Sequence, residues 1–298
     1  MDGRRLSITN LDKVLYPGPG FTKGEVIDYY ARIAPVLLPH LAGRPVTLIR
    51  YPNGVEGKHF YEKRCPPHHP DWVKTAEVWA GDRAGKIEFT LVEERATLVW
   101  LAQLAALELH PSLSLATDIE QPTVLAFDLD PGPPATIVEC CRVALLLRSL
   151  FEGFGLQCFP KSSGSKGMQV YVPLNGDVTY EATKPYSRAV AQALERAEPD
   201  LVLSRMTKSL RGGKVFVDWS QNTSSKTTVA VYSLRAREHP TASTPLAWDE
   251  VQDALDAGNP DCLRFEASEV LERVDRLGDL FAPVLELEQE LPESPESG

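Results

Sequence analysis

The stretch "VLAFDLDPG", residues 124–132, places two carboxylates at the end of an apolar run. Its first four residues are typical of a buried strand, and the Pro-Gly pair ends that strand. Because residues i and i+2 of a strand face the same side, Asp128 and Asp130 are expected to point into one space. Two such charges repel unless a cation lies between them. The pair therefore predicts a divalent-cation site, with an ordinary polar strand end as the alternative.

A third carboxylate, Asp218, lies at the end of a second apolar strand, in "VFVDWS". Three carboxylates on neighbouring strands can hold two Mg²⁺ or Mn²⁺ ions, which prefer oxygen ligands and leave positions open for phosphates. Such a pair of ions can activate an attacking hydroxyl and stabilise a leaving pyrophosphate oxygen. The two acidic segments together indicate two-metal chemistry.

The segment "SSGSKG", residues 162–167, lies between two predicted strands. Its backbone N–H groups and the hydroxyls of Ser163 and Ser165 can bind an anion, and Lys166 can neutralise it. The spacing differs from that of a P-loop, in which the lysine follows the second glycine directly. A flexible hairpin loop is the alternative, but beside an acidic metal site we interpret the segment as a triphosphate cradle.

The composition is that of an ordinary globular protein: 298 residues, 43% hydrophobic and 24% charged. No apolar stretch approaches the roughly 20 residues that a membrane span needs, and the N-terminus lacks the apolar core of a signal peptide. Five scattered cysteines without CxxC spacing indicate reduced thiols and no zinc site. We expect a cytoplasmic protein with no membrane partner.

The net charge of −10 does not exclude a nucleic-acid partner, because it is unevenly spread. Residues 245–298 carry 15 Asp and Glu but only 3 Lys and Arg, so the rest of the chain has a small positive net charge. A polyanion responds to the local field rather than to the total charge.

The order of elements predicts a mixed α/β protein. We expect a helix from about Lys23, with Thr22 and Glu25 as a capping box, and an apolar helix that ends near His110. Strands are expected at 46–50 and 86–92, around the acidic and Ser/Gly segments, and in "KVFVDWSQ"; helices are expected at about 134–154 and 184–198. From residue 286 the acidic, Pro/Ser-rich chain is typical of a disordered tail.

Six ordered motifs resemble one known family. They are "NLDKVLYP…FTKGEVIDYY", "FYEKRCP", "LVWLAQLAALELH", "FDLDPG", "SSGSKGMQVYVPL" and "VDWSQN…YSLR". Together they resemble the polymerase domain of bacterial DNA ligase D, within the archaeo-eukaryotic primase superfamily. We expect no nuclease or ligase module, so the closer resemblance is to the stand-alone primase-polymerases, such as those associated with ligase C.

The resemblance implies a role for each matching residue. Asp128, Asp130 and Asp218 would be the catalytic metal ligands. The incoming nucleotide would be bound by His110, Ser163, Ser165, Lys166, Gln221 and Arg235. A downstream 5′-phosphate would be bound by Asn10, Lys13 and Lys23; Phe60 and Tyr61 would stack on template bases, and Arg50 and Arg211 would contact the DNA backbone. Strand alternation predicts that at least one ring of the aromatic pair is buried.

The implied fold is a primase-type catalytic unit with an RRM-like sheet at about 111–285, an N-terminal DNA-contacting module at about 1–110 and a tail at 286–298. The implied activity is template-dependent nucleotidyl transfer, with a preference for ribonucleotides, at short gaps and broken ends that carry a downstream 5′-phosphate. Two Mn²⁺ or Mg²⁺ ions would serve as cofactors, and NTP or dNTP as substrate. An ATP-dependent DNA ligase and an end-binding protein are the implied partners, at the nucleoid.

Three other functions stay open on the sequence. A de novo primase would share the same acidic site, although Lys13 and Lys23 favour gap filling. A non-catalytic DNA-end bridging factor would gain nothing from carboxylates that face a polyanion. A phosphatase of the haloacid-dehalogenase type also begins with DxD, but it needs a later acidic pair, where this chain has "VDWS".

Overall fold

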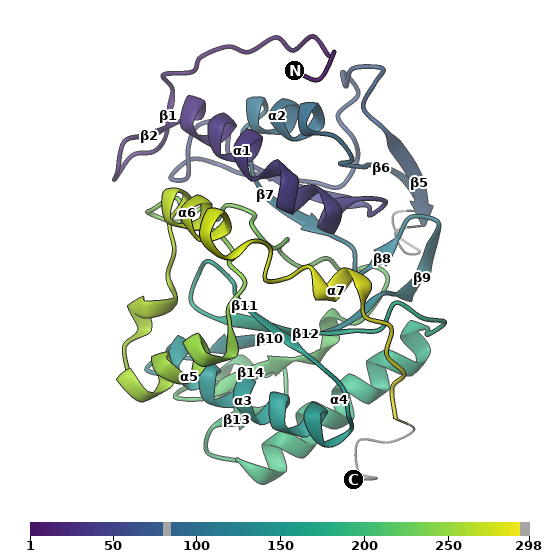
Figure 1. Ribbon diagram of the computed structural model, residues 1–298, viewed down its shortest axis with the longest axis vertical. Coiled ribbons are helices and arrows are strands. Elements are labelled where there is room, and N and C mark those ends of the chain that lie inside the picture. Colours follow the sequence, from purple (N-terminus) through teal and green to yellow (C-terminus); the bar gives the residue numbers. More distant parts are fainter. Residues whose placement is uncertain (80–84, 293–298) are drawn as a thin grey trace. The chain divides into compact units, whose positions relative to one another are not determined.

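The computed structural model describes residues 1–79 and 85–292, which form two compact units (Figure 1). Unit 1 comprises Met1–Ile119, Thr227–Ser243 and Phe265–Asp279. Unit 2 comprises Glu120–Lys226, Thr244–Arg264 and the segment that starts at Leu280. No helix in the described ranges has both the length and the apolar character needed to cross a membrane.

Unit 2 contains a five-stranded sheet of order β11-β12-β10-β14-β13, in which only the β13–β14 pair is parallel. Its strands are β10 (Val124–Pro131), β11 (Phe159–Ser162), β12 (Met168–Pro173), β13 (Val202–Leu203) and β14 (Val215–Asp218). Its helices are α3 (Ile137–Gly153), α4 (Tyr180–Ala197), α5 (Trp248–Ala257) and α7 (Pro283–Glu286). The predicted alternation of strands and helices is confirmed in this unit.

The two faces of this sheet differ in chemistry. The ring of Phe127 on β10 lies 5.7 Å from that of Phe151 on α3, and the neighbouring Cys140 thiol donates to Leu129 O at 3.5 Å. Helix α3 therefore covers the face that carries these apolar side chains. Because side chains alternate along a strand, Asp128 and Asp130 lie on the opposite face.

Unit 1 contains a sheet of order β4-β3-β6-β5, in which β7 also pairs with β3. Its strands are β3 (Val46–Arg50), β4 (Phe60–Glu62), β5 (Thr75–Trp79), β6 (Lys86–Thr90) and β7 (Ala106–Pro111). Its helices are α1 (Lys23–Leu41), α2 (Arg95–Gln103) and α6 (Ala267–Leu277). Short elements elsewhere are β1 (Val14–Tyr16), β2 (Phe21–Thr22), β8 (Ser114–Leu115), β9 (Asp118–Pro122), η1 (Lys208–Leu210), η2 (Trp219–Gln221) and η3 (Pro260–Leu263).

The expected helix that ends near His110 is wrong in its second half. Helix α2 ends at Gln103, and the chain turns at Ala105, whose φ of 57° is left-handed. It then continues as β7, in which His110 is the antiparallel partner of Thr47 on β3. The long apolar run satisfies its backbone groups by pairing with a distant strand, which helical propensity does not anticipate. His110 therefore lies on a strand.

The predicted start of the first helix is confirmed. Thr22 is the N-cap of α1, and its side chain accepts a hydrogen bond from Glu25 N. The Glu25 carboxylate in turn accepts one from Thr22 N at 2.7 Å. This reciprocal pair satisfies two backbone donors that would otherwise lack partners at the helix start.

The expected disordered tail at 286–298 falls partly outside the described residues, because 293–298 are not among them. In the part that is described, Gln289 Nε2 donates to Pro173 O at 2.8 Å and to Gln157 O at 3.0 Å. Gln289 N also donates to Leu174 O at 3.0 Å, so backbone and side chain of Gln289 attach this segment to unit 2.

Candidate active site

The acidic residues of the two predicted strands lie side by side in unit 2. Asp128 on β10 and Asp218 on β14 are direct partners in the antiparallel ladder, and Asp130 lies two residues further along β10. Directly opposite residues have Cβ atoms about 4.5–5.5 Å apart and point to the same face. The structure therefore brings the three predicted carboxylates together.

Asp128 lies in an environment that disfavours its charge. Burial raises the pKa of this carboxyl to about 6, and the negative charges of Asp130 and Asp218 act in the same direction. A hydrogen bond from Gln169 Nε2 to Asp128 Oδ1, at 3.1 Å, and the charge of Lys161 partly offset that rise in pKa. Asp128 is thus repelled by the two neighbouring carboxylates, a repulsion that a divalent cation would relieve.

The other two carboxylates are held by donors from the chain. Asp218 Oδ1 accepts from Ser220 N at 3.0 Å and Oδ2 from Gln221 Nε2 at 2.7 Å. Asp130 pairs with Lys166 at 3.4 Å and with Arg211 at 3.3 Å. The predicted nucleotide ligands Lys166 and Gln221 therefore contact the acid cluster directly.

The residues of the cluster fit a pair of hard divalent cations. Their donors are carboxylate oxygens, which Mg²⁺ and Mn²⁺ prefer. Gln169 Oε1 is buried beside Asp128 and has no hydrogen-bond partner among residues 1–79 and 85–292; a cation-bound water could satisfy such an acceptor. Within the same ranges, no three His, Cys, Asp or Glu side chains are arranged as a metal site. Asp130 and Asp218 are engaged by the chain's own donors.

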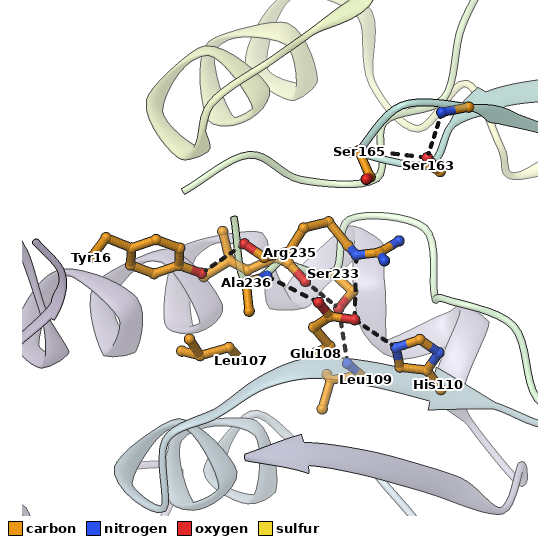
Figure 2. A network of polar contacts seen from close by, with 12 residues as sticks. Tyr16, Leu107, Glu108, Leu109, His110, Ser163, Ser165, Ser233, Arg235 and Ala236 are labelled. Atoms are coloured by element: carbon orange, nitrogen blue, oxygen red, sulfur yellow. Dashed lines mark hydrogen bonds and ion pairs between the residues drawn. The ribbon is translucent and has the colours of Figure 1, made fainter. Parts of the chain in front are cut away.

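The Ser/Gly segment forms a tight turn between β11 and β12. Ser163 Oγ accepts from Ser165 N and from Gly167 N, both at 3.3 Å (Figure 2). A Cβ at Gly167 would lie 2.1 Å from Leu129 O, so a side chain there has no room. Close packing of the turn against β10 thus requires glycine at this position and keeps the turn next to the acid cluster.

A second polar network lies in unit 1 and centres on Glu108, a residue the sequence analysis missed (Figure 2). The buried Glu108 carboxylate contacts His110 Nε2 at 2.9 Å and Arg235 Nε at 3.3 Å, and accepts from Ala236 N at 3.0 Å. Burial favours a higher pKa, but the hydrogen bond with His110 and the charge of Arg235 outweigh it and lower the pKa of Glu108 to about 2. The role of His110 and Arg235 in nucleotide binding stays a prediction.

The signal for Glu108 was present in "ELH" but depended on the correct secondary structure. On a strand, Glu108 and His110 share a face because they are two residues apart. On the expected helix they would have pointed about 200° apart. The wrong prediction of a helix therefore concealed the partner of His110.

The three residues predicted to bind a 5′-phosphate lie close together in unit 1. Lys13 N donates to Asn10 O at 3.1 Å, and Lys23 N donates to Lys13 O at 2.8 Å. The Lys23 ammonium is buried against Thr9 O, at 2.9 Å. Burial, followed by the charge of Lys13, lowers the pKa of Lys23. Two repelling ammonium groups at the start of α1 form a place where an anion would be stabilised.

The prediction that at least one ring of the aromatic pair is buried is wrong: Phe60 is 57% exposed and Tyr61 59%. Both lie on β4, a three-residue strand at the edge of its sheet, where neither face is covered. Arg50, predicted to contact the DNA backbone, pairs with Glu62 at 2.9 Å and donates to Leu104 O at 3.0 Å. Both rings are therefore accessible in unit 1, one on each side of β4.

The chain is similar to proteins of one known family. The family model of the LigD primase-polymerase domain matches residues 22–281. The chain is 45% identical over 282 residues to the multifunctional non-homologous end joining protein LigD of Mycolicibacterium smegmatis, covering 94% of this chain and 36% of that protein. It is 32% identical over 278 residues to the bifunctional non-homologous end joining protein LigD of Bacillus subtilis, covering 93% of this chain and 44% of that protein.

A solved structure shares the whole fold. The polymerase domain from Mycobacterium tuberculosis ligase D, solved in complex with DNA, matches with a TM-score of 0.87 and 43% identity, over 96% of this chain and 99% of that one. The chain spans less than half the length of these curated relatives. It belongs to the LigD primase-polymerase domain family, a family of nucleotidyltransferases.

Proposed function

We propose that this protein is a template-dependent nucleotidyltransferase that fills short gaps and broken DNA ends carrying a downstream 5′-phosphate, in end-joining repair. The observation that carries the proposal is the pairing of Asp128 with Asp218 across β10 and β14, with Asp130 on the same face. Asp128, Asp130 and Asp218 would hold two Mg²⁺ or Mn²⁺ ions. The ions would supply activation of the attacking 3′-hydroxyl and stabilisation of the leaving pyrophosphate.

The surroundings of the acids support a triphosphate as the substrate. Lys166 and Arg211 bring positive charge to Asp130, and Ser163, Ser165 and Gln221 add polar groups near the cluster. Lys166 and Arg211 would give a triphosphate charge-assisted hydrogen bonds in place of their present ion pairs with Asp130. These residues would therefore bind and orient the nucleotide.

Unit 1 would bind the DNA. Asn10, Lys13 and Lys23 would hold the downstream 5′-phosphate, and Phe60 and Tyr61 would stack on template bases. The relative of known structure from Mycobacterium tuberculosis was solved with DNA, which supports a nucleic-acid partner for this chain. We further infer a preference for ribonucleotides, a ligase and an end-binding protein as partners, and a place in the cytoplasm at the nucleoid.

A primer-extension panel tests this function. Gapped, nicked, overhanging and unprimed DNA are each offered with Mn²⁺ and with NTPs or dNTPs, with and without a 5′-phosphate downstream. We expect the fastest addition of one nucleotide at a 5′-phosphorylated gap, with NTP ahead of dNTP. Synthesis mainly on unprimed template would favour a de novo primase, and DNA binding without any incorporation would favour a bridging factor.

A further inference from the structure

A row of four polar side chains crosses the sheet of unit 2. Lys161 on β11 is the register partner of Gln169 on β12, Gln169 of Asp128 on β10, and Asp128 of Asp218 on β14. Since directly opposite residues point to the same face, all four side chains share the face of the acid cluster. Two of them, Lys161 and Gln169, have no role in the proposed function.

The lysine end of the row is the most buried. Lys161 is 1% exposed and Gln169 is 4% exposed. Lysine is rarely buried to this extent, so its position in one row with the carboxylates of Asp128 and Asp218 calls for an explanation. The Lys161 ammonium lies 5.5 Å from the centre of the Tyr171 ring on the same face, an arrangement that stabilises a positive charge in a desolvated place.

Gln169 connects the lysine side of the row with the acids. Its Nε2 donates to Asp128 Oδ1 at 3.1 Å, which fixes one carboxylate oxygen of Asp128 and leaves the other to a cation. The strand spacing of about 4.8 Å places the backbone of Lys161 roughly 10 Å from that of Asp128. The charge of Lys161 lowers the pKa of Asp128, so the ammonium acts on the acid cluster through its field.

We propose that Lys161 is a built-in counter-charge of the acid cluster and that Gln169 is a positioning residue that orients Asp128 for metal binding. The proposal rests on the function proposed above. Before cations arrive, the lysine reduces repulsion among the three carboxylates. Once the metal ions are bound, the positive charge of Lys161 repels them. The site therefore holds its ions less tightly than the three carboxylates would without the lysine. Such a site exchanges its metal ions and releases pyrophosphate more readily.

The two residues have opposite effects on metal affinity, which permits a direct test. Mn²⁺ binding is measured by the electron paramagnetic resonance of free Mn²⁺ in a titration of the full chain, without nucleotide or DNA. Lys161→Met should lower the Mn²⁺ dissociation constant by roughly 5- to 20-fold, from Coulomb's law at about 10 Å and an effective dielectric constant of about 40–80. Gln169→Met, which removes the donor at similar length, should raise the constant by roughly 3- to 10-fold through loss of one charge-assisted hydrogen bond.

Controls separate the possible failures. Lys184→Met removes an exposed lysine charge on α4 and should leave Mn²⁺ affinity unchanged. Asp218→Asn should lose most Mn²⁺ binding. If Lys161→Met does not fold by circular dichroism, Lys161→Gln removes the charge and keeps a polar end, and it should shift affinity in the same direction.

The outcomes are distinguishable. If the Lys161 variants bind Mn²⁺ as the wild type does or more weakly, and Asp218→Asn does not bind it, Lys161 is not a counter-charge. The proposed function then stands. Unchanged binding in Gln169→Met overturns the positioning role. If the wild type binds no Mn²⁺, or if Asp218→Asn binds it normally, both the roles proposed for Lys161 and Gln169 and the proposed function are wrong.

Discussion

Asp128 and Asp218 are direct partners on neighbouring antiparallel strands, although 89 intervening residues separate them in the sequence. The ladder places both carboxylates on the polar face of the sheet of unit 2, while apolar neighbours such as Phe127 pack against α3 on the other face. Since strand pairing is set by the apolar face, the packing of the core determines the position of the acids.

The ionised Glu108 carboxylate stabilises unit 1 in a pH-dependent way. Its pKa falls from the ordinary 4.5 to about 2 on folding, so the stabilisation is present above pH 4.5 and is lost as the pH falls toward 2. It amounts to at most about 3 kcal/mol in the free energy of unfolding. Glu108→Gln cannot titrate, so the stability advantage of the wild type over this variant should shrink between about pH 4.5 and 2.

Urea denaturation of both proteins across that pH range measures the effect. Glu77→Gln, at an exposed position on β5, is the matched control and should show no such trend. A stability difference between wild type and Glu108→Gln that stays constant from pH 5 to 2.5 would contradict the description of Glu108 as the buried, ionised partner of His110 and Arg235.

The two lysines at the start of α1 should determine the preference for a 5′-phosphate. Lys13→Ala/Lys23→Ala is expected to bind 5′-phosphorylated and 5′-hydroxyl gaps equally and to lower the slope of log affinity against log salt by about one to two. Fluorescence anisotropy with gapped duplexes at several salt concentrations gives both quantities. The control Lys74→Ala/Lys86→Ala removes the same charge from exposed positions in unit 1 and should keep the preference. If Lys13→Ala/Lys23→Ala also keeps the preference for a 5′-phosphate, the phosphate site lies elsewhere.

The exposed rings of Phe60 and Tyr61 should contribute to DNA binding and little to folding. Phe60→Ala/Tyr61→Ala is expected to weaken binding of gapped DNA by about 1–3 kcal/mol per stacked base, with a nearly unchanged melting temperature. Leu277→Ala, at another exposed apolar position of unit 1, controls for loss of surface area. A large fall in melting temperature with unaltered DNA affinity would show that the rings are structural.

Two glycines with opposite surroundings test the packing of the Ser/Gly turn. Gly167→Ala would place a methyl 2.1 Å from Leu129 O and should destabilise the protein by about 1–3 kcal/mol or more. Gly153 is the last residue of α3, and a Cβ added there would meet no atom within 4 Å. Gly153→Ala should therefore be neutral or stabilise the protein by up to about 1 kcal/mol. Chemical denaturation compares the two, and equal effects would contradict the close approach of the turn to β10.

Local patterns in the sequence predicted those features that depend on neighbouring residues. The Thr22–Glu25 capping box and the shared face of Asp128 and Asp130 follow from spacing alone, and both are present. The pairing of β7 with β3 could not be predicted from local patterns, because a continuous apolar run is equally typical of a helix. Only the distant strand β3, which forms hydrogen bonds with its backbone, makes it a strand.

Residues whose role depends on strand register could not be found in the same way. Glu108 was missed because its partner His110 was placed on a helix, and Lys161 and Gln169 join the acid cluster only through the order β11-β12-β10. Exposure at a sheet edge is likewise a property of the assembled sheet, which explains why both rings of the aromatic pair are accessible.

Nucleotide addition by Asp218→Asn tests the central claim most directly. Extension of a primer across a one-nucleotide, 5′-phosphorylated gap is measured with Mn²⁺ for the wild type, for this variant and for Asp177→Asn, an exposed carboxylate of unit 2. We expect a rate about a thousandfold lower, or no product, for Asp218→Asn in a folded protein, because a metal ligand contributes several kcal/mol to the transition state. Asp177→Asn should match the wild type. Gap filling by Asp218→Asn at the wild-type rate would contradict the assignment of the paired acids as the catalytic centre.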